Sequence, residues 1–312
     1  MSSTGNSDKA VLFLLFNRPD LAGRVFEEIR KAAPPRLYFS VDGPRAGRND
    51  EVELVEQCRA LTEKVDWDCE VFTLFRESNL GCGKAVSSGL EWFFESEESG
   101  IILEDDCLPS PTFFPYASEL LDRFQEDDRV MHVGGSNHQR GKKRTSSDYY
   151  FSRYEHVWGW ASWRRAWQKY DFEMKSWRDR RDEAWLGTLF ANPRTTGLFW
   201  ADIFDQVKLG RIDTWDYQWR YTIWDHEGYS IIPEANLISN IGFDARATHT
   251  RDGASPDANR PLECLSFPIS HPENVVICEK ADHFHEACYL SEISTKARFR
   301  SFLSGLRNHF SK

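Results

Sequence analysis

Three adjacent acids, Glu104, Asp105 and Asp106, directly follow the apolar run Ile101–Leu103. The run has the character of a buried β-strand, so the three carboxylates are expected at the edge of a sheet. Carboxylates held this close repel one another and are costly to desolvate unless a cation or hydrogen-bond donors offset their charge. A hard divalent cation, Mg²⁺ or Mn²⁺, that carries a phosphate-rich ligand would offset it. The first hypothesis is therefore a metal-assisted phosphate site.

A purely structural explanation of these acids is also open. Asp105 or Asp106 could cap the helix that is predicted to begin near Thr112, since acids are good N-terminal caps. Two prolines, Pro109 and Pro111, weigh against this explanation. They impose several extended residues between the acids and the helix, and the metal hypothesis is favoured.

The segments before the acids alternate between strands and helices. Strands are predicted over 10–16, 36–41, 70–75 and 100–103, and helices over 20–34, 49–65 and 85–95. This alternation predicts the α/β class, with a doubly wound, mostly parallel sheet. In such folds ligands bind outside the carboxyl ends of the strands.

Polar side chains follow each of the four predicted strands. Arg18 follows the first, Asp42 the second, the segment Asn79–Lys84 the third, and 104–106 the fourth. Since the carboxyl ends of parallel strands meet at one edge of a sheet, these groups are expected to form one site. The glycine-containing bend in the third group is either a helix entry turn or a diphosphate contact made by Lys84. Neither G-x-G-x-x-G nor G-x-x-x-x-G-K-[ST] is present, so neither hydride transfer nor a P-loop ATPase is supported.

From residue 149 the composition shifts to tryptophan-rich segments with weaker periodicity. We expect residues 149–290 to form an irregular, aromatic-rich half that packs against the half formed by residues 10–135 within one domain. A helix from Thr214 to about His226 is predicted to carry the acid Asp216 in its first turn. Short strands are predicted over 130–133 and 229–232, and loops over 239–243 and 247–250.

The composition narrows the function classes. The chain has 312 residues, a formal net charge of −10 and seven cysteines without a C-x-x-C pair. The acidic charge argues against nucleic acid as a partner, since no overall basic field would neutralise phosphates. The scattered cysteines suggest neither a disulfide framework nor a structural zinc site. No apolar run of signal-peptide length opens the chain, and the run 11–16 is too short to cross a bilayer, so a cytoplasmic location is expected.

Five motifs give the chain a resemblance to the GT-A nucleotide-sugar glycosyltransferases. They are Phe16-Asn17-Arg18-Pro19, Ser40-Val41-Asp42-Gly43, Leu103-Glu104-Asp105-Asp106, Trp158-Gly159-Trp160 and Thr214-Trp215-Asp216-Tyr217-Gln218-Trp219. Over residues 10–250 the chain looks most similar to bacterial hemolytic-protein-like glycosyltransferases and to animal N-acetylglucosaminyltransferase I. The resemblance implies a Rossmann-like GT-A fold. It also implies transfer of a sugar from a nucleotide-diphosphate sugar, with UDP as the expected nucleotide, to a hydroxyl acceptor.

The resemblance further assigns roles at the strand ends. It implies that Asp106 ligates Mn²⁺ or Mg²⁺, which in turn grips the nucleotide diphosphate. Asp105 is implied to contact the ribose or support the ligand, and Glu104 to orient its neighbours. Nucleoside contacts fall on Arg18 and Asp42. The carboxylate of Asp42 could accept a hydrogen bond from a base N–H, and the guanidinium of Arg18 could contact a diphosphate.

The same resemblance implies Asp216 as the base of an inverting transfer, in which the acceptor hydroxyl attacks the anomeric carbon in line. Here Tyr217 and Gln218 separate Asp216 from Trp219, one residue more than in the family's Trp-Asp-Asp-Trp segment. The structural alternative is an acid that interacts favourably with the helix dipole. His249 resembles a family histidine that approaches the diphosphate or metal, and its alternative is an ordinary surface residue.

The expected acceptor is a glycan or a lipid-linked glycan. Trp158 and Trp160 would stack on its sugar rings, with core packing as the alternative for at least one of them. Residues 296–312 carry five basic side chains and no acid, with Phe and Leu at helical spacing. This basic amphipathic tail would either make a peripheral contact with the inner face of the membrane or pack on the domain.

Two other functions fit parts of the sequence. A nucleotidyltransferase shares the doubly wound fold and the acid-bound metal, but the segment after the first strand lacks the Gly-rich signature loop typical of that class. A glycan-binding protein without catalysis would use the aromatic-rich half and would leave Glu104–Asp106 without a purpose. Metal-dependent binding of a nucleotide diphosphate separates the enzyme from the lectin.

Overall fold

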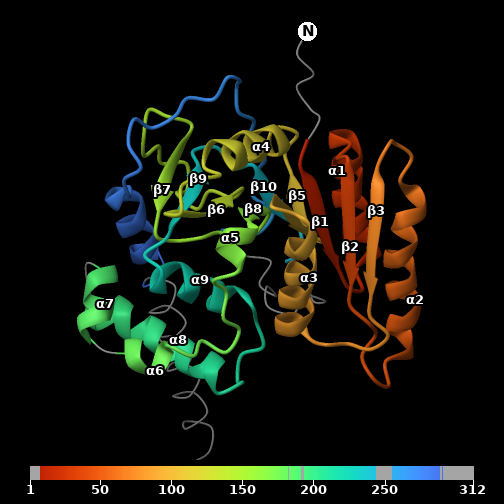
Figure 1. Cartoon of the computed structure of the whole chain (residues 1–312), viewed down its shortest axis with the longest axis horizontal. Helices are drawn as coiled ribbons and strands as arrows, with labels where there is room; N and C mark the ends of the chain where they lie inside the picture. The colour runs from red at the N-terminus through yellow and green to blue at the C-terminus, as the bar shows by residue number, and fades with distance from the viewer. Residues whose placement is uncertain (1–7, 182, 191–192, 244–254, 289, 291–312) are drawn as a thin grey trace, which may run out of the picture.

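The computed structural model describes residues 8–181, 183–190, 193–243, 255–288 and 290. Its centre is an eight-stranded sheet in the order β3-β2-β1-β4-β8-β6-β9-β7 (Figure 1). The strands of this sheet are β1 (Ala10–Leu15), β2 (Arg36–Val41), β3 (Glu70–Phe75), β4 (Ser99–Glu104), β6 (Val130–Gly134), β7 (Tyr149–Ser152), β8 (Trp160–Trp163) and β9 (Tyr229–Pro233).

Most neighbouring strands of the sheet run parallel. β3, β2, β1 and β4 are parallel to one another, as are β6 and β9, whereas β8 and β7 run antiparallel to their neighbours. The predicted α/β class with a mostly parallel sheet is therefore confirmed. A second, two-stranded sheet pairs β5 (Cys107–Pro109) with β10 (Ile238–Asn240).

Helices cover both faces of the central sheet. All six residues of β1 are buried, and they alternate between two cores. Val11, Phe13 and Leu15 belong to one core, and Ala10, Leu12 and Leu14 to the other. Because side chains of a strand alternate between its faces, a fully buried strand requires cover on both sides, as in a doubly wound fold.

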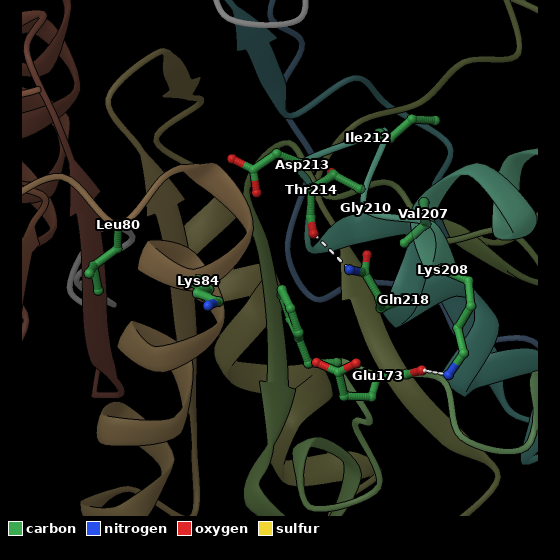
Figure 2. A pocket seen from close by; sticks show the side chains of 11 residues that line it. Leu80, Lys84, Glu173, Val207, Lys208, Gly210, Ile212, Asp213, Thr214 and Gln218 are labelled. Atoms are coloured by element: carbon green, nitrogen blue, oxygen red, sulfur yellow. Dashed lines mark hydrogen bonds between the residues drawn. The ribbon is translucent and has the colours of Figure 1, made fainter.

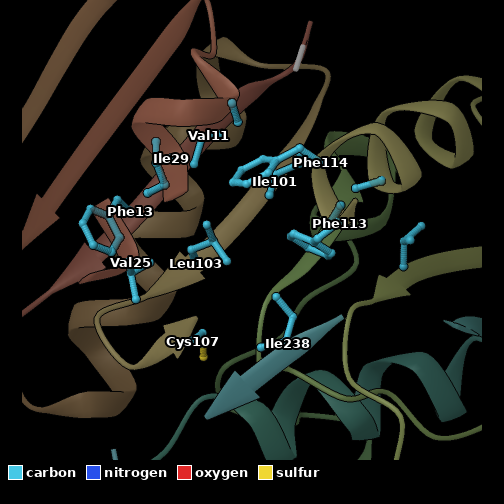
Figure 3. Close-up of a cluster of buried hydrophobic side chains, with 14 of the residues drawn as sticks. Val11, Phe13, Val25, Ile29, Ile101, Leu103, Cys107, Phe113, Phe114 and Ile238 are labelled. Carbon is cyan, nitrogen blue, oxygen red and sulfur yellow. The ribbon is translucent and has the colours of Figure 1, made fainter. Parts of the chain in front are cut away.

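The first face is covered by α1 (Pro19–Ala32), α2 (Asn49–Arg59) with the 3₁₀ turn η1 (Ala60–Lys64), and α4 (Phe113–Arg123). Its core is aliphatic and phenylalanine-rich. Figure 3 shows Val25 of α1 and Phe113 of α4 among side chains of β1 and β4. The apolar positions of α1 recur at helical spacing, so one side of the helix is buried and the other is exposed.

The second face is tryptophan-rich. Its helices are α3 (Cys82–Ser96), α5 (Arg164–Trp167), α6 (Trp177–Arg180), α7 (Glu183–Leu189), the π-helical turn η2 (Pro193–Gly197), α8 (Leu198–Lys208) and α9 (Asp216–Asp225). Trp160, Trp200, Trp219 and Trp224 are all buried in the core below them. No helix of the described residues has the length and apolarity needed to cross a membrane.

The chain reverses its direction across the sheet between β1 and β4. It builds β1, β2 and β3 outward on one side and then returns to place β4 on the other side of β1. The carboxyl ends of β1 and β4 are thus neighbours at a topological switch point, where ligands of open α/β sheets bind. Arg18 follows one of these strands, and the acids 104–106 end the other.

Several predicted elements differ from the structure. The second half is not irregular, because β7, β8 and β9 continue the sheet; the first two have only four residues each, too few for a periodic signal. The predicted loop 239–243 begins within β10, and the predicted helix 49–65 divides into α2 and η1. A helix over 279–288 was not predicted. His249, the loop 247–250 and the tail 296–312 lie outside the described residues.

Candidate active site

Arg18 holds two of the three acids at the switch point. Its Nε donates to Oδ2 of Asp105 at 3.2 Å, and its Nη2 forms ion pairs with Asp105 and, at 3.0 Å, with Oδ2 of Asp106. All three side chains are largely buried, with 15% of Arg18 exposed. Burial opposes the charge of the guanidinium, but the two carboxylates outweigh it and raise the pKa of Arg18. The predicted neighbours are thus one ion-paired cluster.

The cluster carries more negative than positive charge. Burial, followed by the charges of Asp106 and Asp105, raises the pKa of Glu104 well above its ordinary value. Burial also raises the pKa of Asp105 to about 6, although Arg18 opposes the shift. With all three carboxylates ionised, one guanidinium would leave an excess of two negative charges, and the raised pKa values reflect the cost of that excess. A divalent cation with oxygen ligands would balance it, so the donor set fits Mg²⁺ or Mn²⁺.

A cation here would have few protein ligands. Within the described ranges, no group of three or more His, Cys, Asp or Glu side chains is arranged to hold a metal ion. Mg²⁺ is commonly held by one or two carboxylates together with water and substrate phosphates. Asp106 suits such a shared site better than a protein-only cage.

The segment after β10 closes over Asp106. The amide of Ile241 donates to the carbonyl oxygen of Asp106 at 2.9 Å, and the amide of Gly242 donates to Oδ1 of Asn240 at 2.9 Å. A Cβ on Gly242 would lie 2.1 Å from Oδ2 of Asp106 and 2.7 Å from Nη1 of Arg18. Only glycine fits there without moving the ion pair. The sequence offered no signal for this contact beyond a glycine in a polar loop.

Asp42 follows β2 and is fixed by donors from the chain itself. Its carboxylate accepts from the amide of Gly43 at 2.9 Å, from Nδ2 of Asn79 at 2.8 Å and from the amide of Leu80 at 3.0 Å. Burial outweighs these bonds and raises the pKa of Asp42. The carboxylate therefore holds together the turns after β2 and β3, at the edge where the resemblance implies nucleoside contact.

The start of α3 is already occupied by an acid that the sequence did not single out. Oδ1 of Asp213 accepts from the amide of Gly83 at 3.0 Å, and a Cβ on Gly81, whose φ is +82°, would lie 2.6 Å from Oδ2 of the same residue. The carboxylate takes the place at the helix N-terminus where a phosphate could bind. Lys84 is exposed and lies at the edge of the cavity beside Asp213 (Figure 2). A diphosphate contact through this bend is thus left to the Lys84 side chain alone.

Asp216 is the first residue of α9 and accepts a short hydrogen bond from the hydroxyl of Thr214. The flanking Trp215 and Trp219 are buried and fix the helix start in the tryptophan-rich core. Glu104 and Asp216 both contribute to raising the pKa of the Cys82 thiol, after its burial. The charges of the acid of α9 and of the acid at the end of β4 therefore both act on this thiol at the start of α3. The region around Cys82 is thus under the influence of carboxylates from two different elements, β4 and α9.

The two predicted acceptor tryptophans lie in different environments. Trp160 is fully buried, with its ring stacked on His132 at 5.0 Å and on Trp215 at 5.5 Å. No face of this ring is available to a sugar, so core packing is its role. Trp158 is partly exposed and lies 5.7 Å from Phe243, next to the glycine that covers Asp106. Only Trp158 stays in the candidate acceptor site.

Comparisons with known proteins identify no family for the chain. No protein-family profile matches it, and no curated protein matches it. Among solved structures, a UDP-glucose pyrophosphorylase complexed with UDP-glucose aligns at a TM-score of 0.27 and 11% identity, over 46% of this chain and 61% of the other. A CMP:2-keto-3-deoxy-manno-octonic acid synthetase complexed with CTP aligns at 0.31 and 14%, over 52% and 77%. The inositol-1-phosphate CTP transferase from T. maritima aligns at 0.29 and 12%, over 53% and 74%.

Proposed function

We propose that the protein is a metal-dependent, inverting glycosyltransferase that moves a sugar from a nucleotide-diphosphate sugar to a hydroxyl acceptor. The expected donor is a UDP-sugar. The observation that carries the proposal is that carboxylates are held in two different settings, one directly after β4 and one at the start of α9. Asp105 and Asp106 are fixed by Arg18 at the switch point. Asp216 is separate, at the start of α9, with a hydroxyl as its partner.

The cluster of Arg18 and the acids serves the diphosphate. Asp106 would ligate Mg²⁺ or Mn²⁺, with His249 as a further ligand or diphosphate contact. The bound cation would supply a positive charge that stabilises the leaving diphosphate. Arg18 keeps the two aspartates in place and adds its own positive charge near the phosphates.

The nucleoside would lie over the ends of β1, β2 and β3. Asp42 and Asn79 already form a hydrogen-bonded unit there at 2.8 Å, so a base that binds them meets a fixed arrangement rather than a mobile one. Asp105 would reach the ribose, Glu104 would orient its neighbours, and Lys84 would contact the phosphates from the start of α3.

Asp216 would take the proton from the acceptor hydroxyl as that oxygen attacks the anomeric carbon. A general base needs a free lone pair and access to the acceptor. Asp216 is partly exposed and accepts from the neutral hydroxyl of Thr214, whereas Asp105 and Asp106 are bound to a guanidinium. Trp158, the partly exposed tryptophan near Asp106, would hold the acceptor sugar.

Calorimetry with UDP tests the binding half of the proposal. We expect UDP to bind in the presence of Mn²⁺ or Mg²⁺, and binding to become undetectable with EDTA or in Asp106→Ala. Asp216→Asn should bind UDP as the wild type does. Binding of UDP that is equally strong with EDTA would refute the metal-dependent site.

Product analysis tests the reaction itself. A glycosyltransferase releases the nucleoside diphosphate from a UDP-sugar, whereas a nucleotidyltransferase makes a UDP-sugar and pyrophosphate from UTP and a sugar 1-phosphate. We expect metal-dependent release of UDP, lost in Asp106→Ala and reduced by about 100-fold or more in Asp216→Asn, as for removal of a general base. Formation of pyrophosphate without release of UDP would establish the nucleotidyltransferase instead.

A further inference from the structure

A cavity of about 390 Å³ opens beside the proposed base. Figure 2 shows Lys84 of α3 on one side of it and Gln218 of α9 on the other, with Glu173 at its lower edge. Phe172 and Thr214 also line the cavity. Its volume is near the lower end of the ordinary range for small-molecule sites, which suits one sugar ring better than a chain of them.

One lining residue, Gln218, has a buried amide whose acceptor has no partner among the described residues. Nε2 of Gln218 donates to the carbonyl oxygen of Thr214 at 2.8 Å, which fixes the orientation of the amide. Its Oε1 has no hydrogen-bond partner among the described residues, although only 2% of the side chain is exposed. A buried acceptor without a donor is costly, so a ligand hydroxyl or a water is expected to satisfy it.

An aromatic ring and charged groups complete the lining. Phe172 packs over the start of α3, since its Cε2 would lie 3.3 Å from a Cβ built on Gly83. The ammonium groups of Lys84 and Lys208 and the carboxylate of Glu173 are exposed around it. A flat apolar ring, a fixed amide and mixed charges match a sugar ring, which has apolar C–H faces and hydroxyl edges.

We propose that this cavity binds one hexopyranose ring, with Phe172 against a ring face and Oε1 of Gln218 accepting from a hydroxyl. The inference rests on the proposed function and places a sugar beside its base. Thr214, which lines the cavity, donates to Asp216 through its hydroxyl. A ring bound there is either the sugar of the nucleotide donor or the sugar of the acceptor, because both meet at the base.

Two binding series separate these sources. In the first, calorimetry with Mn²⁺ compares UDP with UDP-glucose, UDP-galactose and UDP-N-acetylglucosamine. In the second, the methyl glycosides of the same three sugars are titrated into the protein with Mn²⁺, once with saturating UDP and once without nucleotide. The variants are Phe172→Ala, which removes the ring, and Gln218→Met, which removes the acceptor at similar volume. Phe284→Ala, at a partly buried phenylalanine outside the cavity, is the matched control.

If the cavity holds the donor sugar, Phe172→Ala weakens binding of the preferred UDP-sugar by ~3- to 10-fold and leaves binding of UDP unchanged. If it holds the acceptor sugar, the same loss falls on the preferred methyl glycoside instead. Gln218→Met weakens binding of the same ligand. Phe284→Ala changes the affinity for neither the UDP-sugar nor the methyl glycoside.

The inference is overturned if no sugar adds affinity in the wild type, or if both cavity variants bind every sugar as the wild type does. These outcomes leave metal-dependent UDP binding intact, so the proposed function would survive them. If the wild type binds no UDP, the proposed function fails, and the glycoside titration without nucleotide still decides whether the cavity binds sugar. Thermal unfolding of each variant shows whether a loss of affinity reflects a loss of fold.

Discussion

The two acidic centres of the candidate site are held from opposite faces of the sheet and in different ways. Asp105 and Asp106 directly follow β4 and are bound by Arg18, which precedes α1 on the face with the aliphatic and phenylalanine core. Asp216 begins α9 on the tryptophan-rich face and is bound by the hydroxyl of Thr214. One centre has a cationic partner, and the other has a neutral one.

This difference separates two tasks that one carboxylate could not perform well. The Arg18 guanidinium engages the oxygens of Asp105 and Asp106, so these oxygens are less available to take a proton from a substrate hydroxyl. Such a carboxylate can still share an oxygen with a metal ion, because its position is fixed. Asp216 has a neutral hydroxyl as a partner and is partly exposed, so one of its oxygens can approach an acceptor hydroxyl as a general base must. The arrangement suits a site in which one centre holds a leaving group and the other activates an acceptor.

The largest expected effect is a loss of stability when the Arg18 guanidinium of the first centre is removed. Arg18→Leu leaves buried carboxylates without their partner, so we expect a loss of about 3–5 kcal/mol in the free energy of unfolding at neutral pH. Urea denaturation measures it. The matched control is Arg24→Leu, at an exposed position of α1, which should change stability by less than about 0.5 kcal/mol. Equal stabilities of the two variants would show that Arg18 does not offset the acids.

The next effect tests the close packing around the first centre. Gly242→Ala places a methyl group where it would lie 2.1 Å from Oδ2 of Asp106, so the carboxylate or the loop must move. Changes to the groups that position a metal ligand typically cost about 10- to 100-fold in metal affinity, and we expect Mn²⁺-dependent UDP affinity to fall by about that factor. Calorimetry checks it, with Gly23→Ala on α1, where nothing lies within 4 Å of the new Cβ, as the control. UDP affinity that is unchanged in Gly242→Ala would place the nucleotide elsewhere.

The parts of the first centre that come from regular elements could be predicted from the sequence. β1 and β4 are unbroken apolar runs, and parallel pairing alone brings their carboxyl ends together, so Arg18 and the acids 104–106 were expected at one edge. The contact of Gly242 with Asp106 could not be predicted. It depends on β10 pairing with β5, a three-residue strand that ends in Pro109, and proline argues against a strand.

The second centre was less predictable because its supports are distant in sequence and aromatic. The start of the helix at Asp216 follows from its own sequence, but the contact of Asp213 with Gly83 joins residues 130 positions apart. Trp158 and Trp160 were both candidates for stacking on the acceptor sugar, with core packing as the alternative for at least one of them, because a tryptophan ring suits either role. The burial of Trp160 follows from β8 lying between β4 and β6, a strand too short to be recognised.

The third expected effect is on the pH dependence of stability, and it concerns His132 in the tryptophan-rich core. His132 is fully buried, stacks on Trp160 and accepts from Nε1 of Trp219 at 3.3 Å, and burial lowers its pKa from 6.5 to about 3. Between these values the unfolded chain binds a proton that the folded protein does not, so stability falls as the pH drops from about 6.5 towards 3.

His132→Phe keeps an aromatic ring at this position and removes the titration. We expect its unfolding free energy to fall less steeply with acid, by up to ~1.4 kcal/mol per pH unit. The variant should also be less stable than the wild type at pH 7, because it loses the bond from Trp219 and the bond between Nε2 of His132 and the carbonyl oxygen of His156. Urea denaturation at pH 6.5, 5.5 and 4.5 gives the slopes. His283→Phe, at an exposed position, is the control, and equal slopes in wild type and His132→Phe would mean that His132 is protonated in the fold.

The smallest effect concerns the partner of the second centre. Thr214→Val removes the hydroxyl that donates to Asp216 and keeps the shape of the side chain. Loss of one such bond is worth about 0.5–1.5 kcal/mol, so the rate of UDP release should change by ~2- to 10-fold while metal-dependent UDP affinity stays the same. Thr222→Val, the same change two turns along α9 at a hydroxyl that bonds only within the helix, should leave the rate unchanged. If Thr214→Val weakens UDP binding and leaves the rate alone, Asp216 belongs with the nucleotide, and the division between the two centres is wrong.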